Sequence, residues 1–285
     1  MPAHSVHHFV PSFLLKEWHS GPDNKLSCFR WENSRFVHDR YTSKSVAQQH
    51  GLYSLNLPQI GDNNLLEREY FAEKVDSPAA VGHKLILTIG IQALTDDDRR
   101  SWARFLLAQV VRTPEKIAHV RMSGVGLVRD FLIPRAFEKR GLPPDKGKEL
   151  YDALTEIAPE FHGDYSLSHL PQMIESQLNG GELLNTTWML RTIKPPAKPF
   201  LVADRPIIYE GNIKAGFVIA LPISPHVFFV ASTAPNAEKL LNDGGDAIFS
   251  TKVNYSTVSL AERYVYARDE GPSKFVKRLL RTGLL

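Results

Sequence analysis

A proline-rich segment, residues 194–199 with the sequence KPPAKP, divides this 285-residue chain into two parts of different character. Proline fixes φ and lacks a backbone donor, so such a segment interrupts regular structure and forms a stiff connection. Residues 61–193 before it carry the apolar spacing of amphipathic helices, whereas residues 200–232 after it contain short apolar runs bounded by turn residues, which is typical of strands. The chain is therefore expected to combine a helical part with a sheet.

Strands are predicted near both ends of the chain. Alternating runs at residues 25–31 and 35–42 flank a Glu-Asn-Ser turn and predict a β-hairpin. After the proline-rich segment, three to four strands joined by short links favour antiparallel pairing; they are predicted at residues 200–203, 207–209, 216–221 and 227–232. Because both groups leave sheet edges that need partners, we expect one sheet built from both.

The clearest predicted helix starts after Thr95, whose hydroxyl can cap amides at the beginning of the helix. An apolar stripe follows at helical spacing, formed by Trp102, Phe105, Leu106, Gln109 and Val110. Gln109 is therefore expected to face the core, with Arg112 at the edge of the same face. Either both side chains reach backbone carbonyls and a core carboxylate, or they face a cavity and hold a ligand. Pro114 is expected to begin the next helix.

Other stretches predict further helices, over residues 65–75, 79–92, 116–139, 146–157, 170–178, 237–241 and 254–267, and a helical turn over residues 46–51. The predicted fold class is α+β, with a mainly helical domain packed on a small antiparallel-rich sheet formed by the N-terminal hairpin and the C-terminal strands. We expect a single domain over residues 1–285. Its three segments are an N-terminal arm and hairpin, a helical layer, and strands with C-terminal helices, over residues 1–60, 61–193 and 194–285.

Composition and cysteine content indicate where the protein resides. A hydrophobic content of 43% and a charged content of 23% are ordinary for a globular protein, and no apolar run approaches the ~20 residues that cross a bilayer. Met1 to Ser5 lacks the features of a secretory signal, and Cys28, the only cysteine, excludes an internal disulfide. We therefore expect a cytoplasmic protein that does not associate with membranes, with Cys28 as a small core residue.

The sequence contains no strong catalytic motif: it has no glycine-rich phosphate loop, HExxH, GxSxG or paired CxxC. What remains is a set of polar residues at structurally constrained places, such as the two histidines that precede the Phe9-Val10-Pro11 run. The set comprises His7, His8, Glu67, Glu73, Gln109, Arg112, Asp204 and Asn254. These side chains are the candidate site.

Histidine and carboxylates can hold a divalent metal or act as a base at a phosphodiester, while arginine stabilises negative charge. We therefore predict His8, Glu73 and Asp204 as catalytic residues and as ligands of Mg²⁺ or Mn²⁺, with Arg112 as a further catalytic residue. The remaining candidates would contact substrate, and these are Gln109, His7, Asn254 and Glu67. His8 is expected to point inward, because it alternates with Phe9 in an extended segment, which leaves His7 more exposed.

Short motifs along nearly the whole chain resemble the bacterial proteins grouped as domain of unknown function 4238. They follow one another in the order expected for that family, and they include HHFVP with Leu14-Leu15, GLY at residues 51–53, Glu67, Glu73, QVVRTP at residues 109–114, DRP at residues 204–206, LPISP at residues 221–225, Asn254 and AERYVY at residues 261–266. One departure is Arg205, where the family is expected to place histidine. The resemblance implies membership of the family and no mechanism.

The polar set favours a metal-assisted phosphodiester hydrolase, a nuclease-like enzyme in a toxin or defence setting. The alternative is a non-catalytic binding or interaction protein in which the same residues pair internally and hold the N-terminal arm to the helical layer. A second alternative is a nucleic-acid binder without catalysis, which requires the basic residues of 274–281 to share one side of the protein with other cations. No protein partner is indicated.

Overall fold

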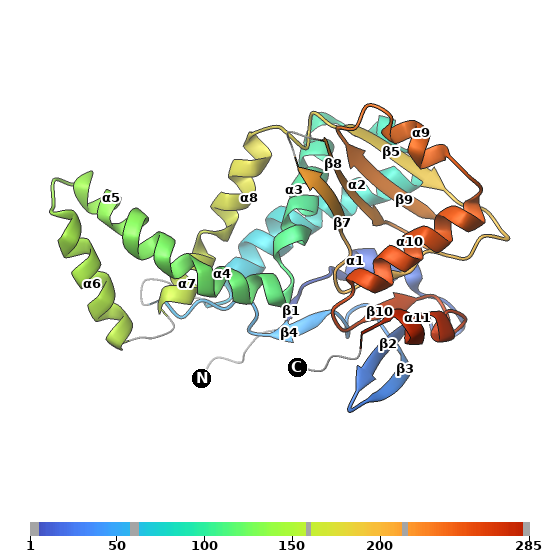
Figure 1. Cartoon of the computed structure of the whole chain (residues 1–285), viewed down its shortest axis with the longest axis horizontal. Helices are drawn as coiled ribbons and strands as arrows, with labels where there is room; N and C mark the ends of the chain where they lie inside the picture. Colours follow the sequence, from blue (N-terminus) through green and yellow to red (C-terminus); the bar gives the residue numbers. More distant parts are fainter. Residues whose placement is uncertain (1–5, 58–62, 158–160, 213–215, 282–285) are drawn as a thin grey trace. The chain divides into compact units, whose positions relative to one another are not determined.

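The computed structural model describes residues 6–57, 63–157, 161–212 and 216–281, and its fold is α+β, as predicted (Figure 1). The chain forms two compact units. The first contains residues 1–7, 49–74 and 114–176, and the second contains residues 8–48, 75–113 and 177–285. A single-domain organisation stays a prediction.

The first unit is helical. Figure 1 shows α5 and α6 as an antiparallel pair that follows α4 along the chain. The helices that lie in this unit or enter it are η2 (Leu66–Asp76), α4 (Pro114–Leu127), η4 (Val128–Leu132), α5 (Ile133–Glu138), α6 (Pro144–Ile157), α7 (Phe161–Ser168) and α8 (Leu170–Asn179). Asp164 links the helices to the preceding chain, because its buried carboxylate accepts from the amide of Asn56 at 2.7 Å and from Arg121.

Helices of the second unit flank its sheets. They are α1 (Ser12–Leu15), η1 (Lys16–Trp18), α2 (Ser77–Thr88), η3 (Ile91–Ala93), α3 (Asp96–Val111), α9 (Ala237–Asn242), α10 (Asp246–Leu260) and α11 (Ser273–Leu279). The predicted start of α3 is confirmed, since the Thr95 hydroxyl accepts from the amide of Asp98 at 3.2 Å and the Asp98 carboxylate accepts from the amide of Thr95 at 3.0 Å. Of its predicted stripe, Trp102, Phe105, Leu106 and Gln109 are buried, and Val110 is half-buried. Helix α1 follows Pro11 without a side-chain cap, and the Ser12 hydroxyl bonds that of Ser43 at 2.8 Å.

Two separate four-stranded sheets replace the single sheet that we expected. One has the strand order β3-β2-β10-β6, formed by Arg35–Tyr41, Leu26–Glu32, Val265–Ala267 and Val202–Ala203. The other has the order β5-β9-β8-β7, formed by Thr187–Thr192, Val227–Ser232, Gly216–Pro222 and Ile208–Asn212. The hairpin therefore pairs directly only with β10, and β6 joins this sheet on the other side of β10. The strands β5, β9, β8 and β7 pair among themselves.

Two helical predictions are wrong. Residues 46–51 contain the strand β4 (Gln48–His50), which pairs with β1 (Val6–His8), because the carbonyl of Ala47 accepts from the amide of Phe9 at 2.9 Å. The helix expected over residues 254–267 ends at Leu260, and the chain then enters β10. The cause is Asp204, whose carboxylate accepts from the amides of residues 262–264 and so holds them out of a helix.

His83 on α2 is buried at 3% exposure, between α3 and the chain that follows β8. Its Nε2 donates to the carbonyl of Ile223 at 2.7 Å, and its ring stacks on Trp102 with centroids 5.9 Å apart. Burial lowers the pKa of His83, because the imidazolium form would lose its hydration; the bond to Ile223 only partly opposes this. The folded protein therefore holds this imidazole neutral.

We expect His83 to make the protein less stable in acid. Below the ordinary histidine pKa of about 6.5 the unfolded chain takes up a proton that the folded chain does not, so stability present above that pH falls as the pH drops, by up to ~1.4 kcal/mol per pH unit. In His83→Phe, urea unfolding between pH 7 and 5 should show a shallower decline. The exposed His50→Phe serves as control. Equal slopes for parent and His83→Phe would contradict this assignment.

Across the described residues, no helix has the length and apolar character needed to cross a membrane.

Candidate functional site

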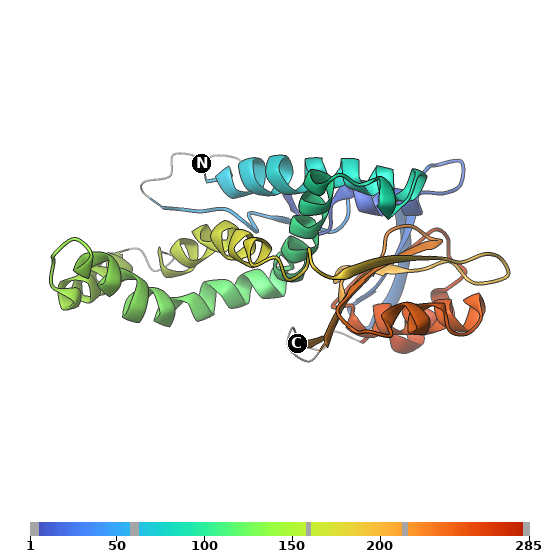
Figure 2. The same ribbon diagram turned by 90° about the horizontal axis from the view of Figure 1, so that it is seen from above.

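A pocket of about 570 Å³ opens in the second unit where α10 and α11 meet the chain that follows the proline-rich segment. The two helices lie side by side in both views of the ribbon (Figures 1 and 2). The pocket floor is apolar and is formed by Phe200, Leu201, Ala267 and Phe275. Its volume is in the range of roughly 300–1,000 Å³ that is usual for ligand sites, so it is the candidate site of this protein. We call it the basic pocket for the charges described below.

Asn254 fixes one wall of the basic pocket. It lies on the buried side of α10, where its Oδ1 accepts from the amide of Leu201 at 2.8 Å and its Nδ2 donates to the carbonyl of Pro199 at 3.0 Å. The segment that leaves the proline-rich region is thereby tied to α10. Asn254 was predicted to contact substrate; it does line the pocket, and both of these hydrogen bonds are to the protein backbone.

Helix α11 supplies two cations to the rim. Val276 of α11 and Leu280, directly after the helix, are buried in a hydrophobic cluster with Phe29, so the helix has one fixed inner face. Lys274 and Arg278 are exposed and line the pocket. The helical spacing therefore determines where these two charges lie.

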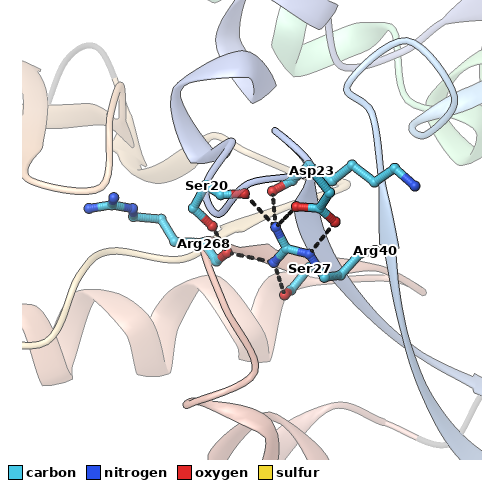
Figure 3. Close-up of polar contacts among 6 residues, drawn as sticks. Ser20, Asp23, Ser27, Arg40 and Arg268 are labelled. Atoms are coloured by element: carbon cyan, nitrogen blue, oxygen red, sulfur yellow. Dashed lines mark hydrogen bonds and ion pairs between the residues drawn. The ribbon is translucent and has the colours of Figure 1, made fainter.

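Arg268 enters the pocket from the loop after β10, and its backbone is held from behind (Figure 3). Its carbonyl accepts from Arg40 Nη1 at 3.1 Å and from the Ser20 hydroxyl. Arg40 also donates to the carbonyls of Ser20 and Lys25, at 2.5 and 2.7 Å, and to both oxygens of Asp23 at 2.9 and 2.7 Å. Figure 3 shows the Arg268 side chain directed away from this cluster.

Burial lowers the pKa of His226, and the charge of Arg268 lowers it further.

The charge of the basic pocket is strongly positive. Four cations line it, Lys198, Arg268, Lys274 and Arg278, against the single carboxylate of Asp269. The difference of +3 equals the formal net charge of +3 of the whole chain. The Asp269 carboxylate is engaged in its own loop, where it accepts from the amide of Gly271 at 2.9 Å. The pocket is therefore suited to an anionic ligand with an apolar part.

The two N-terminal histidines have the opposite exposure to the one predicted. His7 is fully buried and His8 is half-buried. The reason is a partner that the strand alternation does not reveal: His7 stacks on Tyr53 with centroids 5.4 Å apart, and its Nδ1 accepts from the Tyr53 amide at 2.8 Å. Because Nδ1 accepts, Nε2 carries the proton and faces Asn64 Oδ1 at 3.3 Å. His7 thus links β1 to the segments around Tyr53 and Asn64 within the first unit.

Arg112 and Gln109 form a buried polar cluster with Asp76 in the second unit. Arg112 is fully buried; its Nε donates to the carbonyl of Phe9 at 3.1 Å and its Nη1 to Asp76 at 2.8 Å. The Gln109 side-chain oxygen faces Arg112 and accepts a hydrogen bond from its Nη2 at 2.7 Å. Of the two roles left open by the sequence, these contacts match the first, with a backbone carbonyl and a carboxylate as acceptors.

His8 lies beside this cluster, and its Nε2 bonds the carbonyl of Lys44 at 3.2 Å. Burial lowers the pKa of His8; the hydrogen bond to Lys44 opposes the shift, Arg112 adds to it and Asp76 opposes it. The structure therefore brings His8, Gln109 and Arg112 to one region of the second unit. Asp76, which the sequence did not single out, is the carboxylate there.

Asp204 is 5% exposed, and its carboxylate binds backbone amides of the chain that follows α10. Its Oδ1 accepts from the amide of Glu262 at 2.9 Å, and its Oδ2 accepts from those of Arg263 and Tyr264 at 2.7 and 3.0 Å. Burial raises the pKa of Asp204 to about 6, although the three amides favour the charged form. Its neighbours thus differ from those of His8.

The predicted carboxylates Glu67 and Glu73 lie on η2 in the first unit, where Glu67 is half-buried and Glu73 is exposed. Among the residues that the structure describes, no group of three or more His, Cys, Asp or Glu side chains is arranged to hold a metal ion. The metal requirement stays a prediction. Burial raises the pKa of the Cys28 thiol to about 12, which fits the predicted core role.

Comparison with known proteins gives a family and no further relative. The family model described as "Protein of unknown function (DUF4238)" matches residues 6–271. No curated protein and no solved structure matches the chain. The match covers most of the chain and includes the motifs from the N-terminal histidines to the AERYVY segment. The chain therefore belongs to the DUF4238 family.

Proposed function

We propose that this protein binds nucleic acid at the basic pocket and does not cleave it. The observation that carries this proposal is that Lys274 and Arg278 share one pocket with Lys198 and Arg268, against one carboxylate. Lysine and arginine bind phosphates and release the counterions condensed on them. The nucleic-acid hypothesis required other cations beside the basic residues of 274–281, and the position of Lys198 and Arg268 in the same pocket supports it.

The polar set supports binding more than catalysis. Arg112, Gln109 and Asp204 bond groups of the protein itself, as the non-catalytic alternative requires. The metal-assisted hydrolase of a toxin or defence system stays a prediction that rests on His8, Glu73, Asp204 and Arg112. A cytoplasmic location is part of the same proposal.

The test is titration of fluorescently labelled single-stranded DNA and RNA of about 20 nucleotides, followed by anisotropy at several salt concentrations. We expect Lys274→Gln/Arg278→Gln and Lys198→Gln/Arg268→Gln each to weaken binding about tenfold and to reduce the salt slope by roughly 0.7 for every phosphate that the variant no longer binds. The matched control is Lys84→Gln/Lys239→Gln, which removes two exposed lysines outside the pocket. Equal affinities for control and pocket variants would overturn the proposal.

The same samples test cleavage. Incubation with Mg²⁺ or Mn²⁺ followed by gel analysis should leave the strands intact. Cleavage that is abolished in His8→Ala would replace the proposal with the hydrolase hypothesis.

A further inference from the structure

The basic pocket has a floor that a purely phosphate-binding surface does not need. Phosphates of a duplex are contacted by side chains on an open surface, and the bases remain stacked inside the helix. Here the cations surround a cavity of about 570 Å³ that is lined by Phe200, Leu201 and Phe275. A ligand that fills this cavity is therefore expected to bring an apolar group together with its negative charge.

Phe275 can provide a stacking surface. It is half-buried on α11, packed at the edge of the hydrophobic cluster that anchors the helix, and it lines the pocket. The guanidinium carbon of Arg278 lies 6.0 Å from its ring centroid. Unpaired bases stack on phenyl rings and on guanidinium planes, and this one helix brings one group of each kind to the pocket.

The polar groups of the pocket offer little for reading base identity. Asn254 uses its side-chain oxygen and nitrogen on Leu201 and Pro199. The Thr251 hydroxyl donates to the carbonyl of Ala247 at 2.7 Å within α10. Stacking combined with phosphate contacts tolerates any base, whereas sequence reading requires free donors and acceptors.

We infer that the basic pocket accepts an unpaired base of a single strand, with Phe275 as the stacking surface and the rim cations on the neighbouring phosphates. This inference rests on the proposed nucleic-acid binding. It predicts preference for single strands over duplexes and weak dependence on base sequence.

The test compares a labelled single strand with a hairpin duplex of equal length, for the parent, Phe275→Leu and Phe36→Leu. Leucine keeps an apolar side chain on the cluster and removes the aromatic face. Phe36 packs against the same cluster and does not line the pocket, so it controls for reduced packing. We expect Phe275→Leu to bind the single strand about tenfold more weakly, since stacking contributes roughly fivefold to a hundredfold per base. Duplex binding and the Phe36→Leu variant should be unchanged.

The outcomes separate the two proposals. If strand and duplex bind equally and Phe275→Leu has no effect, the inference is overturned while nucleic-acid binding stands. If a mononucleotide competes as strongly as the strand, the pocket takes a free nucleotide and the inference is again overturned. If neither polymer binds the parent, the proposed function itself fails.

Discussion

Replacing Arg112 by alanine is expected to lower the free energy of unfolding by about 3 kcal/mol. The side chain is fully buried, and its loss removes the donors from the Asp76 carboxylate, the Phe9 carbonyl and the Gln109 amide. The value is at the lower end for buried ion pairs, because 21% of the Asp76 side chain remains exposed. Urea unfolding measures the change, with the exposed Lys84→Ala on α2 as the control, which should stay within about 0.5 kcal/mol of the parent.

A double-mutant cycle assigns this loss to the pair. If Arg112 acts through Asp76, then Arg112→Ala/Asp76→Ala should be more stable than the sum of the two single losses implies, because no uncompensated charge remains. Additive losses would show that Arg112 acts through other groups, and the pairing described here would be wrong.

Replacing Arg40 by lysine is expected to cost about 2 kcal/mol of stability and to weaken single-strand binding several-fold. An ammonium group cannot reproduce the bidentate contact with Asp23 while it also holds the carbonyls of Ser20 and Arg268. The loop that carries Arg268 into the basic pocket should then be less well fixed. Urea unfolding measures the loss of stability. Anisotropy measures strand binding, under conditions where the parent and the variant are both fully folded.

Arg35→Lys is the matched control for Arg40→Lys, because it lies exposed on the same strand, β3. It should change neither stability nor binding. The binding measurement decides the role of Arg40: a variant that is destabilised but binds the strand as the parent does would show that Arg40 stabilises the fold without positioning Arg268. The expected effect on binding rests on the proposed function. The expected loss of stability in Arg40→Lys does not, so it can be tested whether or not the protein binds nucleic acid.

The elements that sequence could predict are those whose determinants are local. Helix α3 follows from the Thr95 cap and from apolar spacing, and the β2–β3 hairpin follows from alternation around a turn. The end of α10 could not be predicted, because Asp204 holds residues 262–264 from a distant part of the chain. The exposure of His7 and His8 could not be predicted either, since alternation alone does not show which side faces Tyr53.

The candidate site divides in the same way. The basic C-terminal helix, which contains Lys274 and Arg278, can be recognised from the sequence. The sequence carried no signal that Lys198 and Arg268 belong with them, because their approach depends on the contacts of Asn254 and Arg40 with distant backbone. The predicted polar set was informative about packing: several of its members are the residues that hold distant segments together.

The most direct test of the central claim is the affinity of a labelled single strand for Lys198→Gln/Arg268→Gln compared with Lys274→Gln/Arg278→Gln. The two variants change residues on different segments of the chain. All four residues line the basic pocket. If the pocket binds the strand, both variants should lose about tenfold in affinity and both should show a shallower salt dependence. Normal binding by the Lys198→Gln/Arg268→Gln variant would contradict the account.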